Sequence, residues 1–235
     1  MIVLALTATP SLPGERPQLL MTGTYHAGEV VVAPGSTWLA VVPQLNHGFV
    51  VEEAEVVVEA VTDPLVGEEG EASGLRVTAP SCFRTPLFLV RGVDSIQTGF
   101  FDTSIEYPTR LEINAPTPIT VFSRRHYALV VECDPEAPTT VDDFMECPLL
   151  LVHELSRQVL ATFTVYAPPE GPFQFASEAA PTVLWAGDID RDGKLDLLLD
   201  LTYHSNVSAP TLFLSSGADK GTLVAEIASF VTTGC

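Results

Sequence analysis

The sequence predicts an all-β fold built from antiparallel β-sandwich modules, and three observations indicate it. Short apolar runs that alternate with polar residues recur along the chain, while helical periodicity is confined to one short stretch. Nineteen prolines and sixteen glycines separate these runs, at intervals typical of sandwiches and barrels. Of 235 residues, 46% are apolar and 17% are charged, which fits a globular protein with a core and excludes a disordered acidic tail.

The clearest strand pattern spans Val50–Val61 and has period two. One face carries Ala54, Val56, Val58 and Ala60, and the other carries Glu53, Glu55 and Glu59. This pattern predicts a strand with one buried and one solvated face. Further strands are expected at Gly28–Ala33, Trp38–Val42, Leu87–Val90, Pro118–Phe122, Tyr127–Glu132, Leu149–Val152, Val159–Tyr166, Thr211–Leu214 and Thr222–Phe230. A short helix is expected at Val141–Glu146, where Thr140 can act as the N-cap.

Two segments are poor in strand pattern and suggest how the chain is divided. Gly67–Gly74 is acidic and rich in glycine, and is expected to be a solvated loop. Val93–Pro108 is the better candidate for a boundary between modules. We therefore expect an N-terminal β module over residues 1–103 and a C-terminal β module over residues 104–235.

The charge balance excludes several kinds of partner. Eleven basic against 30 acidic residues give 11 − 30 = −19, which repels nucleic acid and disfavours an anionic membrane surface. The one basic doublet, Arg124–Arg125, lies between two predicted strands and is expected to be a solvated turn. No apolar run approaches the ~18–20 residues that a membrane-spanning helix needs. We expect a protein without a membrane span.

The four cysteines, Cys82, Cys133, Cys147 and Cys235, indicate an oxidising compartment. Their spacing contains no C-x-x-C, which argues against a zinc knuckle or a redox pair. Three pairings are possible, and we favour Cys133–Cys147, since the residues between them are acidic and loop-like. Cys82 is then left to pair with Cys235, and the alternative is four reduced thiols in a cytosolic chain. The expected location is extracytoplasmic, meaning periplasmic, at the cell surface or secreted.

The N-terminal Met1–Ala8 is apolar, but no lysine or arginine precedes Arg16. A secretory signal needs a basic start, so we do not expect an intact one here. The same residues fit a first β-strand or the start of a trimmed chain.

One loop has the chemistry of a metal site. Carboxylates stand at positions 1, 3, 5 and 9 of the nine residues 188–196, with glycine at position 6. Ca²⁺ prefers six to eight oxygen ligands, and alternating aspartates on a tight turn can direct several carboxylates inward. The predicted ligands are Asp188, Asp190, Asp192, the backbone carbonyl of Lys194, and Asp196.

The residues around this loop distinguish it from an EF-hand. Position 12, where an EF-hand has its bidentate glutamate, is Leu199, and the flanking Thr182–Ala186 and Leu195–Leu201 have strand periodicity. Trp185–Asp200 resembles the calcium loops of FG-GAP repeats (VCBS-type, as in integrin propellers), which bind Ca²⁺ between adjacent strands through residues matching the five predicted ligands. The motif occurs once, so the resemblance implies neither a complete propeller nor integrin-like adhesion. The C-terminal half also resembles uncharacterised bacterial extracytoplasmic proteins.

Other candidate sites are weaker. His153–Glu154 begins like the zincin motif H-E-x-x-H, but Arg157 stands where the second histidine is required. The segment Asp200–Asn206 gathers polar side chains into an expected turn, where they could contact a small molecule or a glycan. Trp38 and Trp185 are expected in the core.

Two functions follow from these observations. The first is a non-enzymatic, calcium-stabilised extracytoplasmic protein that binds a protein or glycan ligand, without an evident catalytic constellation. The second is a secreted hydrolase acting on a polysaccharide or peptide, in which Ca²⁺ only stabilises the fold. In both, the ion is structural, and the alternative to both is an Asp/Gly-rich turn that binds no cation.

Overall fold

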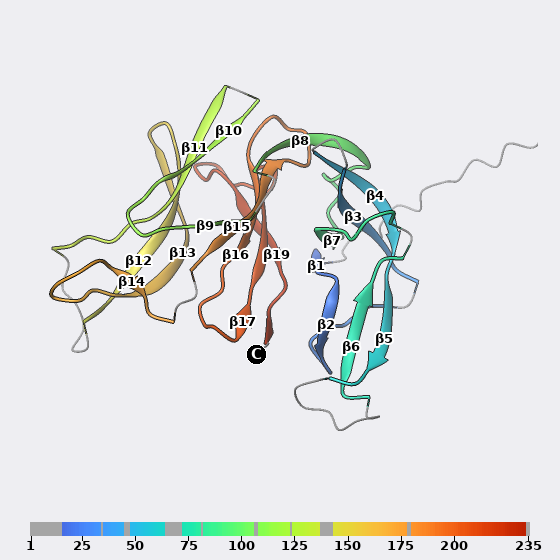
Figure 1. Ribbon diagram of the computed structural model, residues 1–235. Coiled ribbons are helices and arrows are strands. Elements are labelled where there is room, and N and C mark those ends of the chain that lie inside the picture. Colours follow the sequence, from blue (N-terminus) through green and yellow to red (C-terminus); the bar gives the residue numbers. More distant parts are fainter. Residues whose placement is uncertain are drawn as a thin grey trace, which may run out of the picture.

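The computed structural model in Figure 1 describes residues 16–33, 35–44, 48–63, 72–80, 82–105, 108–122, 124–136, 143–177 and 180–233. In these residues every regular element is a β-strand, and all strand pairs are antiparallel. The predicted all-β, antiparallel fold class is therefore confirmed. The strands are β1 Gln18–Leu20, β2 Gly23–His26, β3 Thr37–Pro43, β4 Phe49–Glu55, β5 Val57–Val61, β6 Gly74–Thr78, β7 Phe88–Arg91, β8 Gly99–Ile105, β9 Thr109–Arg110, β10 Thr117–Val121, β11 Arg125–Val131, β12 Phe144–His153, β13 Ser156–Tyr166, β14 Gln174–Phe175, β15 Thr182–Asp188, β16 Asp196–Asp200, β17 Val207–Ser208, β18 Pro210–Leu214, β19 Ala225–Ser229 and β20 Thr232–Thr233.

The largest sheet has ten strands, in the order β1-β7-β3-β4-β8-β15-β16-β18-β19, with β9 beside β15. Its end strands β1 and β19 contact each other, so the sheet curls until it is nearly closed. A second sheet has the order β10-β11-β12-β13-β14, and smaller sheets are formed by β2-β6-β5 and β17-β20. Because β8 pairs with β4 on one side and with β15 on the other, one sheet contains strands from both predicted modules.

The C-terminal strands bury both of their faces. Leu198 and Leu212 belong to the core enclosed by the large sheet, which also contains Trp38 and Trp185. Leu197, Leu199 and Phe213 pack in a second core against the five-stranded sheet. A strand buried on both faces needs apolar residues at consecutive positions, and this explains the runs Leu197–Leu199 and Thr211–Leu214.

Two secondary-structure predictions are wrong, and that for Val50–Val61 holds only in part. Gly28–Ala33 is a turn followed by irregular chain rather than a strand. Val50–Val61 is interrupted at Val56, after which β5 pairs with β6 in the three-stranded sheet, so that Ala60 and Val58 (36% exposed) lie outside the core. Residues 144–146 of the expected helix begin β12, because Phe144 pairs with Tyr166 of β13 and the two rings lie 5.5 Å apart; residues 140–142 lie outside the described ranges.

The predicted Cys133–Cys147 disulfide is present and links the end of β11 to β12 across a Cα–Cα distance of 4.9 Å. Both half-cystines are buried in the second core, with Cys133 3% exposed and Cys147 fully covered. The expected pairing of Cys82 with Cys235 is not tested, since Cys235 lies outside the described residues.

Reducing this disulfide should lower the free energy of unfolding by about 3 kcal/mol, because a bridge over a loop of this length restricts the unfolded chain. Urea unfolding of the wild type with and without dithiothreitol measures the loss. A Cys133→Ala/Cys147→Ala double variant is the control and should show no further loss on reduction. An unchanged wild-type midpoint in dithiothreitol would contradict the prediction.

Candidate metal centre

The loop singled out by its aspartates connects two paired strands. β15 ends at Asp188 and β16 begins at Asp196, and Gly187 stands opposite Asp196 in the antiparallel register. Ile189 and Leu195 are buried at the two ends of the loop. Gly193 has a φ of 81°, which is in the left-handed region that favours glycine. The loop therefore has the β-loop-β arrangement that the sequence predicts.

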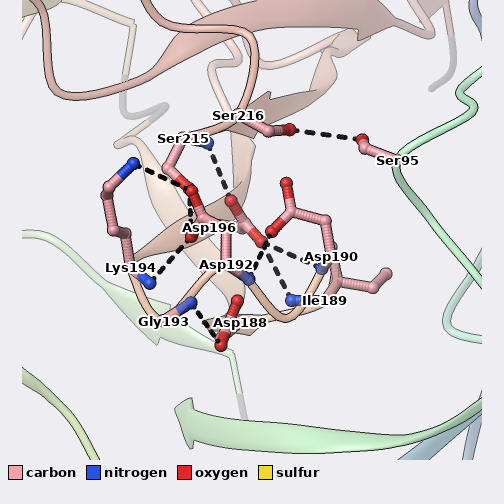
Figure 2. Close-up of polar contacts among 10 residues, drawn as sticks. All are labelled: Ser95, Asp188, Ile189, Asp190, Asp192, Gly193, Lys194, Asp196, Ser215 and Ser216. Carbon is pink, nitrogen blue, oxygen red and sulfur yellow. Dashed lines mark hydrogen bonds and ion pairs between the residues drawn. The ribbon is translucent and has the colours of Figure 1, made fainter.

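Three carboxylates converge inside this hairpin. Asp188, Asp190 and Asp196 each place an oxygen within 4.8 Å of the other two, a group that could hold a metal ion (Figure 2). Asp188 is 1% exposed and Asp196 is fully buried. Three acidic groups this close, two of them shielded from water, repel one another unless protons or a cation neutralise them.

The pKa values of two of these carboxyls are raised by burial first and by this repulsion second. Burial raises the pKa of Asp196 to about 8, with a further increase from the charge of Asp190, although the backbone N–H groups of Ser215, Ile189 and Asp190 act in the opposite direction. Burial raises the pKa of Asp188 to about 6, and the charges of Asp190 and Asp192 add to the effect. Without a cation, the folded protein therefore favours protonated carboxyls at these positions.

Two oxygens of the cluster have no hydrogen-bond partner although they are buried: Asp188 Oδ1 and Asp190 Oδ2. The other oxygen of each carboxylate is used within the loop, since the Gly193 N–H donates to Asp188 Oδ2 at 3.0 Å and the Asp192 N–H donates to Asp190 Oδ1 at 3.2 Å. A buried acceptor without a partner is destabilising, and native structures contain few of them. A cation among the carboxylates supplies the missing partner, so the residues present fit a metal ion.

Asp192 and Lys194 lie differently from the other predicted ligands. The Asp192 carboxylate accepts hydrogen bonds from Lys194 Nζ (3.0 Å), the Lys194 N–H (2.8 Å) and Ser215 Oγ (2.9 Å). Burial acts to raise the pKa of Asp192, but these hydrogen bonds lower it overall. The structure thus brings together three of the four predicted carboxylates. Asp192 and the Lys194 carbonyl stay predicted ligands.

Sequence reasoning missed the groups that attach the loop to the rest of the molecule. The Ser215 N–H, just after β18, donates to Asp196 Oδ1 at 2.8 Å (Figure 2). Arg191 Nη2 donates to the backbone carbonyls of Gln97 (3.3 Å) and Thr98 (2.9 Å), ahead of β8. These partners are far from the aspartates in sequence, and no motif marks them. Only the pairing of β16 with β18 and of β15 with β8 brings them close.

Gly187 allows the close approach of β8 to the loop. A Cβ at this position would lie 2.3 Å from the Asp102 carbonyl oxygen and 2.4 Å from the Trp185 ring, neither of which can move easily. Gly187→Ala should therefore lower the free energy of unfolding by about 1–3 kcal/mol through overpacking. Gly193→Ala is a matched control, because its Cβ meets nothing within 4 Å and its cost is only the strain of a positive φ. Chemical denaturation of both variants compares the two effects, and an equal or smaller loss for Gly187→Ala would contradict the steric argument.

The other sequence candidates have structural partners. His153 stacks on Tyr127, with ring centroids 4.2 Å apart, and its Nδ1–H donates to the His126 carbonyl at 2.9 Å. Trp38 and Trp185 are core residues, as predicted, with exposures of 2% and 0%.

The Asp200–Asn206 segment borders a cavity of about 360 Å³, lined in part by Arg110, Asp200 and His204. Asp200 Oδ1 accepts the N–H groups of Thr202 (3.1 Å) and Ala209 (2.8 Å), so this carboxylate organises the turn that contains it. His204 Nδ1 accepts the Asn206 N–H at 3.2 Å in the same turn. These contacts give both side chains a structural role.

Comparison with known proteins found no matching family model, no similar curated protein and no similar solved structure. Within the described ranges, there is no helix with the length and apolar character needed to cross a membrane.

Proposed function

We propose that this chain is a calcium-stabilised extracytoplasmic protein that acts in binding or cell-surface interaction. The observation that carries the metal part of the proposal is the buried, unpartnered Asp188 Oδ1, which lies beside two further carboxylates in a closed hairpin. The FG-GAP-like spacing of residues 188–196 supports the same conclusion from the sequence.

The donor set favours a hard cation. Every side-chain ligand candidate offers oxygen, which suits Ca²⁺ and Mg²⁺ better than zinc or copper. Ca²⁺–O distances of ~2.3–2.6 Å separate oxygens on opposite sides of an ion by about 4.6–5.2 Å. Each of the three carboxylates has an oxygen within 4.8 Å of the other two, which is compatible with such a separation. The irregular ligand geometry of a loop also suits Ca²⁺ better than Mg²⁺, which demands a near-ideal octahedron.

The surroundings of the cluster support a structural role for the ion. Asp188 and Asp196 are covered from solvent, so little room is left for a substrate beside the ion. The loop is instead attached to two other segments, through Ser215 and through Arg191. An ion at this position neutralises the carboxylates and so holds three segments of the chain together.

The extracytoplasmic location is supported by the Cys133–Cys147 disulfide, because disulfides persist mainly in oxidising compartments. A role in binding rather than hydrolysis is inferred from the side chains around the cavities. Asp200 and His204, which share one cavity, are both engaged in the turn that contains them. The secreted-hydrolase alternative stays a prediction.

Calorimetric titration tests the metal site directly. Calcium added to chelator-treated wild-type protein should bind at one site per chain, and magnesium should bind more weakly. Asp188→Asn removes one charge from the cluster and should abolish measurable calcium binding. Asp219→Asn removes an equal charge from an exposed position and should leave binding unchanged. Absence of calcium binding by the wild type would refute the proposed site.

A further inference from the structure

Two neighbouring hairpin turns enclose a cavity at one end of the five-stranded sheet. The β10–β11 and β12–β13 turns lie side by side there, because β11 pairs with β12 so that Tyr127 stands opposite His153 (Figure 1). The cavity has a volume of about 500 Å³ and is lined by Arg124, Arg125, His126, His153 and Glu154. We call it the hairpin-tip cavity. It shares no residue with the aspartate cluster between β15 and β16, although the charge of Arg125 acts on Lys194 in that loop.

The two arginines of this cavity are adjacent in the chain and line the same cavity. Both are exposed, and among the described residues neither guanidinium has a hydrogen-bond or ion-pair partner. Some other cations are paired, such as Arg157 with Glu132 and Lys194 with Asp192. With 30 acidic residues for 11 basic ones, carboxylate partners are plentiful in this chain. Two adjacent arginines left without one are therefore available to an external anion.

The histidines beside them are held in place. His153 is fixed by its stack on Tyr127 and by its bond to the His126 carbonyl. His126 Nδ1 lies 3.2 Å from Thr120 Oγ1 on the neighbouring strand. Because these rings are already fixed, less conformational entropy is lost at the cavity when a ligand binds.

We propose that the hairpin-tip cavity binds an anionic polysaccharide, one that carries sulfate, phosphate or uronate groups. Planar guanidiniums bind such oxyanions through paired N–H donors. The Glu154 carboxylate, which also lines the cavity, can accept hydrogen bonds from sugar hydroxyls. This inference rests on the proposed role in binding and names the class of ligand.

The charge of the molecule favours a thin polymer over other polyanions. A flat anionic membrane meets a wide area of a protein with a net charge of −19, whereas a single polysaccharide chain can contact the hairpin tips alone. A nucleic acid presents one charge per ~1.7 Å of duplex and needs an extended basic face. The described cavity provides two arginines and two histidines in one place.

The test measures binding of dextran sulfate, with neutral dextran as the reference, to calcium-loaded wild-type protein. Arg124→Gln/Arg125→Gln should weaken binding of dextran sulfate by about tenfold or more, since charge-assisted hydrogen bonds are lost. Arg76→Gln/Arg84→Gln changes the net charge equally in the N-terminal part of the chain, and its affinity should match the wild type. The proposal is overturned if both double variants lose the same affinity for dextran sulfate. It is also overturned if the wild type binds neutral dextran as tightly as dextran sulfate.

Two further arms identify other ligands and separate the two proposals. Preferential binding to anionic phospholipid vesicles or to single-stranded DNA, rather than to dextran sulfate, overturns the assignment to a polysaccharide. Calcium titration of the same sample is read independently. If the protein binds calcium but does not bind dextran sulfate, only the cavity assignment is contradicted. If it binds dextran sulfate but does not bind calcium, only the metal site is contradicted.

Discussion

Saturating calcium should raise the melting temperature of the wild-type protein by about 8–16 °C, and Asp190→Ala should remove this increase. An ion that binds only the folded state stabilises it by ~4 kcal/mol at 1,000 times its dissociation constant, and ~1 kcal/mol shifts the melting temperature of a chain this long by about 2–4 °C. Asp190 Oδ2 is buried and has no other partner, so the variant takes a ligand from the ion. It also loses the hydrogen bond from the Asp192 N–H to Oδ1, a cost that is present with and without calcium.

Differential scanning calorimetry with calcium and with excess chelator measures this effect. Asp219→Ala is the control, because it removes an exposed aspartate elsewhere and should keep the full calcium response. If the melting temperature of the wild type is the same in calcium and in chelator, the hypothesis of a structural ion is contradicted.

Calcium-free protein should lose stability as the pH rises from about 4 to 8, whereas the gain in stability on adding calcium should grow over the same range. The pKa of Asp196 is about 8 in the folded chain against an ordinary value of 3.8, mainly because the group is buried. The folded state therefore holds a proton that the unfolded chain releases, and this stabilisation is complete below pH ~4 and disappears as the pH passes the folded value. One pKa unit corresponds to ~1.4 kcal/mol, so the loss due to Asp196 is of the order of 5 kcal/mol by pH 8. Calcium competes with these protons and binds best when they have left.

Asp196→Asn tests the cause of this pH dependence. Asparagine cannot ionise, so the calcium-free variant should show a flatter pH profile than the calcium-free wild type. Its amide nitrogen cannot accept a backbone N–H as the two carboxyl oxygens do, so the variant should be less stable than the wild type at low pH. It should also lose the response to calcium. Urea unfolding of resin-treated protein at pH 5, 6, 7 and 8 gives these profiles, and a calcium-free wild type whose stability rises with pH would contradict the argument.

The strands were predictable where one face meets the core and the other meets water, but the way the strands assemble was not. Val50–Glu55 and Val57–Val61 continue the same alternation, yet β4 joins the large sheet and β5 joins the small one. The period of a pattern specifies strand conformation, and the partner strand is chosen by packing over long distances in sequence. The expected helix failed for the same reason, because β13 offers residues 144–146 a long antiparallel partner.

Within the metal centre, the predictable part is the local one. The spacing of Asp188, Asp190 and Asp196 places three carboxylates on one tight turn, and Gly193 permits the turn. Their burial was not predictable, because it depends on β8 and β18 packing against the hairpin. The contacts of Ser215 and Arg191 depend on the same packing.

Three features of this protein were predicted from its amino-acid sequence: the chain forms antiparallel strands, a disulfide closes the Cys133–Cys147 loop (the favoured one of three pairings), and one turn carries closely spaced carboxylates. These features are set by short-range periodicity, turn chemistry and residue spacing. Two others arise only in the folded molecule, where Asp188 and Asp196 are sealed from water and two arginines and two histidines meet at the tips of separate hairpins. Both outcomes depend on which strands lie side by side, and that choice is made by the burial of apolar surface across the whole chain rather than by any local segment.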